Sequence, residues 1–482
     1  MTVHDRLFID GDWTESTGTA TLEVISPHTE EVVGRTPAGT RKDIDRAVAA
    51  ARRAFDQGPW PHTDPGERAA AVGRIAGLLA QRRDEVAELI TEEMGCPVTV
   101  SRLGQVGEAQ AVWSWFAELG AGFTWEDERA APMGTVTVRR EPVGVVAAVV
   151  PWNGPQIVVA GKLAAALVAG CTAVVKPSPL APLDCYPLAE MIQEAGIPPG
   201  VVNIVPGGAD AGAHLVAHPG VDMVSFTGSV ATGRRIGAVC GEHLKRCTLE
   251  LGGKSAAIVL DDAELTATMG SLRTAALINS GQTCVAQTRV LASRARYDEV
   301  VDALAETARA MRTGDPSDPA TELGPLVSES QRERVEGYVE LGRKEGARLV
   351  TGGERPFPRG WYVTPAVFAD VANDMRIARE EIFGPVLSVI PYDDEDDAVR
   401  IANDSEFGLA GSVWTADRER GLAVARRVRT GTYGVNTYGV QACAPLGGYK
   451  CSGVGRELGP EGLESYLECK SILHEGTACT TT

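Results

Sequence analysis

The sequence predicts an α/β protein that contains two doubly wound domains and a separate β-strand arm. Its length of 482 residues exceeds what one ordinary hydrophobic core accommodates, so two or three domains are expected. Short apolar runs alternate with helix-like segments over residues 143–253, and a similar alternation resumes after residue 284. Strands that alternate with helices in this way form a parallel sheet covered by helices on both faces.

Composition and charge exclude several classes of protein. The formal net charge of −18 argues against nucleic-acid binding, which normally requires a basic surface. The ten cysteines are dispersed without a C-x-x-C pair, and no ligand spacing implies a metal site. The N-terminus lacks the pattern of a signal peptide, and no apolar run approaches the ~18 residues of a membrane span. A cytoplasmic protein with reduced thiols is therefore predicted.

The N-terminal region is expected to contain short strands followed by two helices. The stretches LFIDGDW and ISPHTEEVVGRT alternate apolar and polar residues around turn signals, which indicates short antiparallel strands. Amphipathic helices are predicted over residues 41–57 and 66–94, and the second is expected to end near Gly95 and Pro97.

A series of buried strands begins near residue 143. The strands are GVVAAVVP, TAVVKPSP, VVNIVPGG, VDMVSFTGS and RCTLELGG, and a helix-like segment separates each from the next. A doubly wound sheet binds ligands in the crevice at the carboxyl ends of its strands. Chemistry is therefore expected at residues 151–153, 176–178, 206–208, 227–229 and 250–253.

The remaining elements follow residue 284 or lie outside both alternating blocks. Strands and helices after residue 284, including a long helix predicted over residues 297–311, indicate a second α/β domain. The stretches ERAAPMGTVTVRRE and LESYLECKSILHEG are typical of strands. We expect both to be arms that pair with other subunits.

Four side chains each admit an ordinary reading and a chemical one. Cys284, in NSGQTCVAQ, is either a buried packing residue or a nucleophile. Lys176 is a lysine that reaches solvent from a strand end, or a donor to a ribose or phosphate. Glu250 is a paired carboxylate or a general base, and Asn153 is a turn residue or an oxyanion-hole donor. Their joint placement where a doubly wound sheet gathers side chains favours chemistry.

The stretch FTGSVATGRRIG follows a strand and opens a helix, so it offers a helix N-terminus to an anion. Gly228 and Gly233 are spaced G-x-x-x-x-G, which matches neither the common Rossmann fingerprint nor a P-loop. On these residues alone, an ordinary strand-to-helix turn is an equally good interpretation.

Several motifs follow one another along the chain. They are PWN (151–153), KPSP (176–179), FTGS (226–229), LELGGKS (249–255), GQTC (281–284), EEIFGPV (380–386) and PLGGYKCSGVGRELG (445–459). In this order and spacing, over nearly the whole length, the chain resembles the NAD(P)-dependent aldehyde dehydrogenase superfamily. The resemblance implies a Rossmann-like cofactor-binding domain (1–123 and 143–250), a catalytic domain (251–450) and oligomerisation arms (124–142 and 460–482).

The resemblance also implies a mechanism. Cys284 matches the family's nucleophile, which forms a thiohemiacetal and then a thioester, and Asn153 with the backbone N–H of Cys284 matches the oxyanion hole. Glu250 matches the base that activates water. Lys176 and Glu381 match the residues that hold the two riboses. A thiol suits this chemistry because its thioester is reactive enough to be hydrolysed.

Other cofactor contacts follow from the same resemblance. Phe383 matches a ring near the nicotinamide, Ser229 and Trp152 match pyrophosphate contacts, and Gly208 lies in the adenine-side turn. Further contacts are expected at Ser178, Pro179, Gly212, Phe226, Gly228, Gly233 and Leu251.

Two departures from the family pattern concern the cofactor and the substrate. Many NAD-preferring relatives carry a glutamate where this chain has Pro179, so NAD is predicted with NADP as the alternative. Many relatives also place aromatic rings where this chain has Gly154, and Gly161 and Leu446 are small or aliphatic. A bulky or cyclic aldehyde, terpenoid or aromatic, is therefore predicted, unless neighbouring loops fill the space.

Three other functions remain as alternatives. A CoA-acylating aldehyde dehydrogenase would resolve the thioester with CoA, and the presence of Glu250 argues against it. A thiol-dependent esterase or thioesterase would use Cys284 without a cofactor, and a silent structural protein would use none of these residues. The expected partner is a small aldehyde, with no nucleic acid and no membrane, and a homodimer or homotetramer is predicted.

Overall fold

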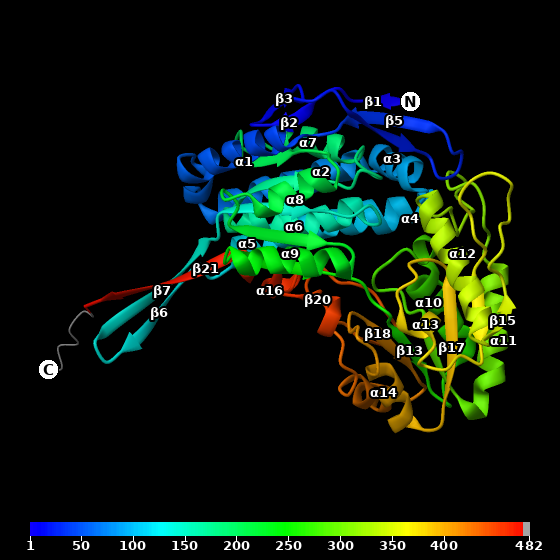
Figure 1. The fold of residues 1–482 in the computed structure, drawn as a ribbon. Helices are drawn as coiled ribbons and strands as arrows, with labels where there is room; N and C mark the ends of the chain where they lie inside the picture. The colour runs from blue at the N-terminus through cyan, green and yellow to red at the C-terminus, as the bar shows by residue number, and fades with distance from the viewer. Residues whose placement is uncertain (476–482) are drawn as a thin grey trace.

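Two large parallel-stranded sheets dominate the computed structural model, which describes residues 1–475 (Figure 1). Helices cover both faces of each sheet, so the predicted doubly wound α/β class is confirmed. A three-stranded arm projects away from the body, and a second three-stranded sheet lies near the N-terminus.

The eight-stranded sheet contains the five buried strands that the sequence predicts. Its central strands run parallel because each is linked to the next through a helix, whereas the strands at both edges pair antiparallel. In sheet order the strands are β20 (Gly453–Val454), β12 (Arg246–Glu250), β11 (Met223–Thr227), β8 (Val145–Val149), β9 (Thr172–Lys176), β10 (Val202–Ile204), β2 (Leu7–Ile9) and β3 (Asp12–Thr14).

Two groups of helices sandwich this sheet and separate its core into two layers. One face packs against α2 (Pro65–Gln81), α3 (Arg83–Met94), α5 (Glu108–Gly122), α6 (Pro155–Ala169), α7 (Cys185–Glu194) and α16 (Gly459–Glu464). The other face packs against α1 (Arg41–Asp56), α8 (Ala209–Ala217) and α9 (Val230–Glu242).

The N-terminal half differs from the sequence prediction in three places. The helix predicted over residues 66–94 is divided at Arg82, whose φ of −100° and ψ of 16° leave the helical region. Residues 98–122, for which no element is predicted, form α4 (Val98–Val100), the π-helix η2 (Ser101–Gly107) and α5. In the N-terminal sheet, β4 (Thr21–Ile25) and β5 (Val32–Pro37) pair antiparallel as expected, but β1 (Thr2–Val3) pairs parallel with β5.

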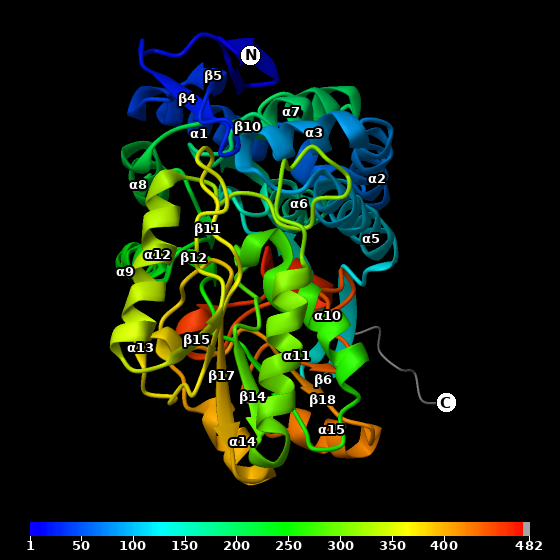
Figure 2. The same ribbon diagram turned by 90° about the vertical axis from the view of Figure 1, so that its right-hand side faces the viewer.

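The seven-stranded sheet forms the second α/β body and lies between α11 (Tyr297–Ala310) and α12 (Glu329–Lys344) (Figure 2). Its strands in order are β15 (Arg348–Thr351), β16 (Ala366–Ala369), β17 (Val386–Tyr392), β14 (Arg289–Ser293), β13 (Ala256–Val259), β18 (Gly411–Trp414) and β19 (Gly434–Val435). One face packs against α10 (Leu265–Leu277) and α11, and the other packs against α12, α13 (Arg376–Arg379), α14 (Glu395–Asn403) and α15 (Arg418–Ala425).

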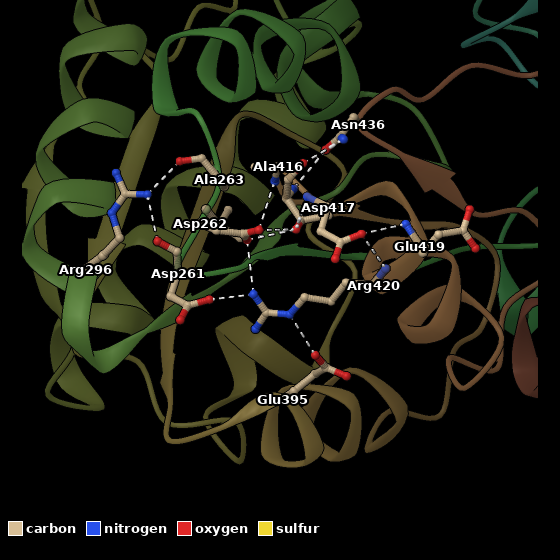
Figure 3. Close-up of polar contacts among 12 residues, drawn as sticks. Asp261, Asp262, Ala263, Arg296, Glu395, Ala416, Asp417, Glu419, Arg420 and Asn436 are labelled. Atoms are coloured by element: carbon tan, nitrogen blue, oxygen red, sulfur yellow. Dashed lines mark hydrogen bonds and ion pairs between the residues drawn. The ribbon is translucent and has the colours of Figure 1, made fainter.

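Polar side chains fill the carboxyl edge of this second sheet, at the loops that follow β13 and β18 (Figure 3). Arg420 donates to Asp261 at 2.7 Å, to Asp262 at 3.2 Å and to Glu395 at 3.0 Å. Asp262 also accepts from the Thr415 hydroxyl at 2.8 Å. These groups pair with one another, so this edge is occupied by its own ion pairs.

The arm consists of β6 (Glu126–Ala131), β7 (Gly134–Pro142) and β21 (Leu467–His474), in the order β21-β7-β6. All pairings are antiparallel, and the C-terminal strand lies along the β6–β7 hairpin although more than 300 residues separate them (Figure 1). Residues 476–482 of the predicted C-terminal arm lie outside the described residues. Among residues 1–475, the helices are all too short or too polar to cross a membrane.

Candidate active site

The predicted site residues converge from opposite edges of the two sheets. In the eight-stranded sheet they follow their strands: Asn153 comes after β8, and Lys176 and Glu250 are the last residues of β9 and β12. In the seven-stranded sheet they precede their strands: Cys284 comes before β14 and Phe383 before β17. The carboxyl edge of one sheet therefore faces the amino edge of the other.

The segment before Cys284 adopts a left-handed backbone over three consecutive residues. Asn279, Ser280 and Gly281 have φ values of 53°, 55° and 71°. Residues other than glycine rarely occupy this region, and such strain concentrates at functional sites. An ideal Cβ on Gly281 would lie 2.5 Å from the Gly384 carbonyl oxygen, so space as well as φ requires glycine here. The turn delivers Cys284 to the site without a regular element to support it.

Cys284 is half-buried, and its sulfur is a free thiol. Loss of solvation raises the pKa of the thiol to about 12, and the nearby carboxyls of Glu381 and Glu250 act in the same direction. The backbone N–H groups of Cys284 and Val285 face the sulfur and lower the pKa. An ideal Cβ on Gly253 would lie 2.5 Å from the Cys284 carbonyl oxygen, so the peptide of Cys284 packs directly on that glycine.

Asn153 is tied to the nucleophile segment by hydrogen bonds at both its side chain and its backbone. Its Nδ2 donates to the Gln282 carbonyl oxygen at 3.0 Å, and its own carbonyl oxygen accepts from Asn279 Nδ2 at 3.3 Å. A primary amide carries two N–H donors, so one donor of Asn153 remains for a ligand. The structure thus brings Asn153 next to the segment that ends at Cys284.

Glu250 is a buried carboxyl in a strongly desolvated position. Its side chain is 4% exposed, and within residues 1–475 its Oε1 has no hydrogen-bond partner. Desolvation raises the pKa of Glu250 well above its ordinary value, Glu457 raises it further, and Lys162 and Arg456 lower it. A carboxyl with a raised pKa is suited to take a proton in a general-base step.

A buried polar cluster lies behind Glu250, and its members are not among the predicted site residues. Lys162 on α6 is 0% exposed and donates to the Glu457 carboxylate and, at 3.1 Å, to the Ser225 hydroxyl. Ser225 also accepts from Thr248 at 2.9 Å and from the Tyr466 hydroxyl at 3.1 Å. One signal was present in the sequence: Lys162 is the sole charged residue in the apolar run IVVAGKLAAALVAG.

Lys176 lies at the end of β9 in a narrow buried environment. Its Nζ donates to the Pro177 carbonyl at 2.7 Å and to the Gly207 carbonyl at 2.8 Å. Burial lowers the pKa of Lys176 to about 8. An ideal Cβ on Gly212 would lie 3.2 Å from the Lys176 side chain, so the two predicted contact residues are neighbours. Gly208 precedes α8, and open space lies where its Cβ would be.

The turn after β11 presents the N-terminus of α9 beside the end of β12. Ser229 caps this helix by accepting from the Thr232 N–H at 3.3 Å. The Gly228 N–H donates to the Glu250 carbonyl at 3.0 Å, which fixes the turn against the neighbouring strand. The other predicted residues of this region pack in pairs, Gly228 against Phe226 and Gly233 against Leu251.

Glu381 and Phe383 face the site from the loop before β17. Glu381 accepts from the Gly253 N–H at 3.0 Å, which places its carboxyl beside the LELGGKS segment. Phe383 has a φ of 63°, which is unusual for a bulky residue, and Gln331 Nε2 donates to its carbonyl at 2.7 Å. Its ring meets Trp152 edge-on, with ring centroids 5.4 Å apart. Trp152 and Phe383 thus join the two sheets across the site.

The remaining predicted contacts lie in the loop after β9. Ser178 is buried and its Oγ accepts from the Leu180 N–H at 3.2 Å, whereas Pro179 is half-exposed at the surface of the loop. Many relatives have a glutamate at the position of Pro179. The loop of residues 177–183 contains no carboxylate that could take its place.

The two glycines on which a wide substrate passage was predicted have aliphatic neighbours. A Cβ on Gly154 would lie 3.1 Å from Ile157 and 3.4 Å from Val158. A Cβ on Gly161 would lie 3.5 Å from Leu458. Leu458 therefore already occupies the space beside Gly161, so this glycine does not by itself widen a passage.

Together these residues provide what a cofactor-dependent oxidation of a carbonyl compound requires. A half-buried thiol, an amide with a second N–H donor and a carboxyl whose Oε1 has no partner within residues 1–475 meet at one place. A buried lysine, a capped helix N-terminus and the half-buried carboxyl of Glu381 line the adjoining region. This donor set fits a dinucleotide, because cations and helix N-termini suit phosphates, and carboxylates suit ribose hydroxyls.

Comparisons with known proteins agree with this chemistry. The family described as "Aldehyde dehydrogenase family" matches residues 13–472. The chain is 48% identical to geranial dehydrogenase from Castellaniella defragrans over 98% of this chain and 99% of that protein. It is 43% identical to 3-succinoylsemialdehyde-pyridine dehydrogenase from a Pseudomonas species, over 99% of this chain and 100% of that protein.

A solved structure shows the same fold at similar identity. The aldehyde dehydrogenase of Mycobacterium tuberculosis, in complex with NAD+, is 49% identical, and the alignment covers 99% of each chain with a TM-score of 0.97.

Proposed function

Because the chain belongs to the aldehyde dehydrogenase family and acts as an NAD-dependent aldehyde dehydrogenase, we propose that Cys284, Asn153 and Glu250 carry its reaction. The observation that carries this proposal is their convergence: Asn153 hydrogen-bonds the segment of Cys284, and the Glu250 carboxyl raises the pKa of the Cys284 thiol.

Cys284 begins the proposed reaction as a nucleophile. Its thiolate attacks the aldehyde carbon, and a C–S bond forms while the carbonyl oxygen becomes an oxyanion. The free N–H of Asn153 and the backbone N–H of Cys284 donate to that oxygen. Because the raised pKa of the thiol favours its protonated form, its proton must leave before the attack, and Glu250 is a nearby acceptor.

When bound, NAD would supply the hydride acceptor for oxidation of the thiohemiacetal on Cys284 to a thioester. Glu250 first releases the proton of the thiol to solvent, and it then takes a proton from water. The hydroxide attacks the thioester carbon, the C–S bond breaks, and the departing thiolate of Cys284 takes up a proton. The products are the carboxylic acid and the free thiol of Cys284. Glu250 suits this step because its Oε1 has no partner in the described part of the chain.

We propose that the cofactor is held by residues of both sheets. Lys176 and Glu381 hold the riboses, and Ser229 and Trp152 contact the pyrophosphate at the N-terminus of α9. Phe383 packs near the nicotinamide. The remaining contacts are proposed at Ser178, Pro179, Gly208, Gly212, Phe226, Gly228, Gly233 and Leu251.

The position of Pro179 bears on the choice between NAD and NADP. A carboxylate there would accept from ribose hydroxyls and repel a 2′-phosphate, and proline does neither. We propose that NAD is the preferred cofactor, with NADP as the alternative, and the NAD+ complex of the similar Mycobacterium tuberculosis enzyme supports this preference. A kcat/KM for NADP that exceeds the value for NAD tenfold would contradict this preference.

For the substrate we propose a bulky or cyclic aldehyde. Support comes from the similarity to geranial dehydrogenase and from the aliphatic side chains of Ile157 and Val158 beside Gly154. The test compares kcat/KM for geranial, benzaldehyde and acetaldehyde with both cofactors. A clear preference for acetaldehyde would overturn the proposed substrate class and leave the reaction itself intact.

The same assay separates the other functions. Acceleration by added CoA, with an acyl-CoA as product, would indicate the CoA-acylating alternative. Ester hydrolysis without aldehyde oxidation would indicate a thiol-dependent esterase. Neither is favoured, because Glu250 provides for hydrolysis by water and the relatives are dehydrogenases.

We further propose a homodimer or homotetramer that forms through the arm. Strands β6 and β21 are the edges of an exposed three-stranded sheet, and an exposed edge is a template for pairing with another chain. A monomeric mass in multi-angle light scattering would contradict this proposal. We also propose a cytoplasmic location, supported by the free thiols of all nine cysteines in the described residues.

A further inference from the structure

Gln105 lies in the π-helix η2 (Ser101–Gly107), between α4 and α5. π-helical turns are rare, and they occur often at functional sites because they shift a side chain out of helical register. The Gln105 side chain is buried, with 7% exposure.

The amide of Gln105 is directed at the backbone of Asn153. Its Nε2 donates to the Asn153 carbonyl oxygen at 3.0 Å, and the same oxygen accepts from Asn279 Nδ2 at 3.3 Å. Because a carbonyl oxygen can only accept, the NH2 end of Gln105 must face Asn153, and the orientation of its amide is fixed.

Asn153 is consequently held at two points by neutral amides. Gln105 and Asn279 fix its carbonyl, and Gln282 fixes one N–H of its side chain. These bonds set the plane in which the second N–H of Asn153 points. If the Asn153 peptide rotated, the donor would leave the position required for an oxyanion, and donor geometry decides how well the hole works.

The other end of the Gln105 amide has no partner in the part of the chain that the structure describes. Within residues 1–475 its Oε1 is buried without a hydrogen bond, 3.9 Å from where a Cβ on Gly154 would lie. An unsatisfied buried acceptor is unfavourable for folding, and an apolar side chain of similar shape would avoid it. The glutamine is therefore explained by its donor end and not by packing.

We propose that Gln105 is a positioning residue, which fixes the oxyanion-hole amide of Asn153 through the Asn153 backbone carbonyl. This inference rests on the proposed role of Asn153.

The first test replaces the amide and keeps its shape. Gln105→Met should lower kcat about tenfold, since misplacement of a catalytic group by about 1 Å costs up to 10²-fold. The KM for NAD should stay unchanged, and the thermal midpoint should stay equal or rise because the unsatisfied acceptor is gone. Gln110→Met on α5 is the matched control, since Gln110 accepts from Arg83 and is expected to leave kcat unchanged.

Gln105→Glu is a second variant with the same shape but no NH2 donor. It should lower kcat at least as much as Gln105→Met, because a carboxylate oxygen would face the Asn153 carbonyl oxygen. If neither variant folds, or if both keep kcat within twofold, the positioning role is overturned.

The decisive readout is a double-mutant cycle with Asn153→Ala. If Gln105 acts through Asn153, Gln105→Met should lower kcat in the wild-type background and change it less than twofold in Asn153→Ala. Equal losses in both backgrounds would overturn the proposal. If Asn153→Ala alone leaves kcat unchanged, the oxyanion role fails and the positioning role fails with it. A loss in Asn153→Ala without a loss in Gln105→Met removes only the positioning role.

Discussion

The two sheets contribute to the site through opposite edges. The eight-stranded sheet supplies side chains at or after strand ends, such as Lys176 and Glu250, and regular parallel strands hold them. The seven-stranded sheet supplies residues that precede its strands, and its carboxyl edge is filled by the ion pairs of Arg420 (Figure 3). The nucleophile therefore depends on a loop, whereas the base depends on a strand.

This difference predicts two kinds of sensitivity. On the nucleophile side, the left-handed backbone at Asn279–Gly281 and neutral amides fix the geometry. Substitutions that change shape should therefore have the largest effects on activity there. On the base side, the buried side chains of Lys162 and Glu457 lie near Glu250. Changes in charge and in pH should therefore have the largest effects on activity there.

The largest expected effect belongs to the nucleophile itself. Cys284→Ala should lower kcat by at least about 10⁴-fold, since removal of a nucleophile costs as much in other enzymes. NAD binding should persist, because the residues proposed to hold it remain. Loss of turnover by reduced-cofactor absorbance, with retained binding by fluorescence titration, checks this. Turnover within tenfold of wild type would show that another group is the nucleophile.

Asn153, Lys176 and Glu250 could be predicted from the sequence, because ligands bind at the carboxyl ends of strands. Strand ends can be recognised in a single sequence, since strand periodicity is a local pattern. The same reasoning does not place Cys284, Glu381 or Phe383, which precede their strands, and their assignment depended on the family motifs. The left-handed φ of Phe383 has no signal in residue type.

Long-range pairs were the least accessible to sequence reasoning. Lys162 and Glu457 are 295 residues apart, and the bond of Gln105 to Asn153 spans 48 residues. The break at Arg82 was also missed, since neither glycine nor proline marks it. Where contacts between distant residues decide the conformation, a local pattern contains too little information.

The second largest effect should come from the base. Glu250→Gln should lower kcat by about 10²–10⁴-fold, because it removes a proton acceptor. In the wild type the rate should rise with pH as Glu250 loses its proton. This rise should be absent in the glutamine variant. A pH–rate profile of both proteins checks this, and an unchanged rise of the rate with pH in the variant would assign the rise to another group.

The same substitution has a consequence for stability. A carboxyl whose folded pKa is raised stabilises the fold below its unfolded pKa, and this contribution is lost as pH rises through the folded pKa. Wild type should therefore lose stability relative to Glu250→Gln between about pH 4.5 and the raised pKa. Urea unfolding across this range measures the difference.

A smaller effect is expected from the turn before the nucleophile. Gly281→Ala should destabilise the protein by about 1–3 kcal/mol through strain alone, and more if the Gly384 carbonyl cannot move. We expect kcat to fall at least tenfold, since Cys284 would shift. Gly337→Ala on α12 is the matched control: its Cβ meets open space, and alanine should stabilise the helix by about 0.4–1 kcal/mol. Equal kcat in both variants would show that the turn does not position the thiol.

The smallest effect on rate should come from Glu457→Gln, which tests the charge side of the comparison. Glu457 raises the pKa of Glu250, and Lys162 lowers it. Removing the negative charge of Glu457 should therefore move the rise of the rate with pH to lower pH. The fold should lose about 3–5 kcal/mol, because Lys162 remains buried without a counter-charge. The double variant Lys162→Met/Glu457→Gln should recover stability and reverse part of the shift. If the rise of the rate moved to higher pH in Glu457→Gln, charge would not control the pKa of Glu250. Geometry would then control the base, as we expect it to control the nucleophile.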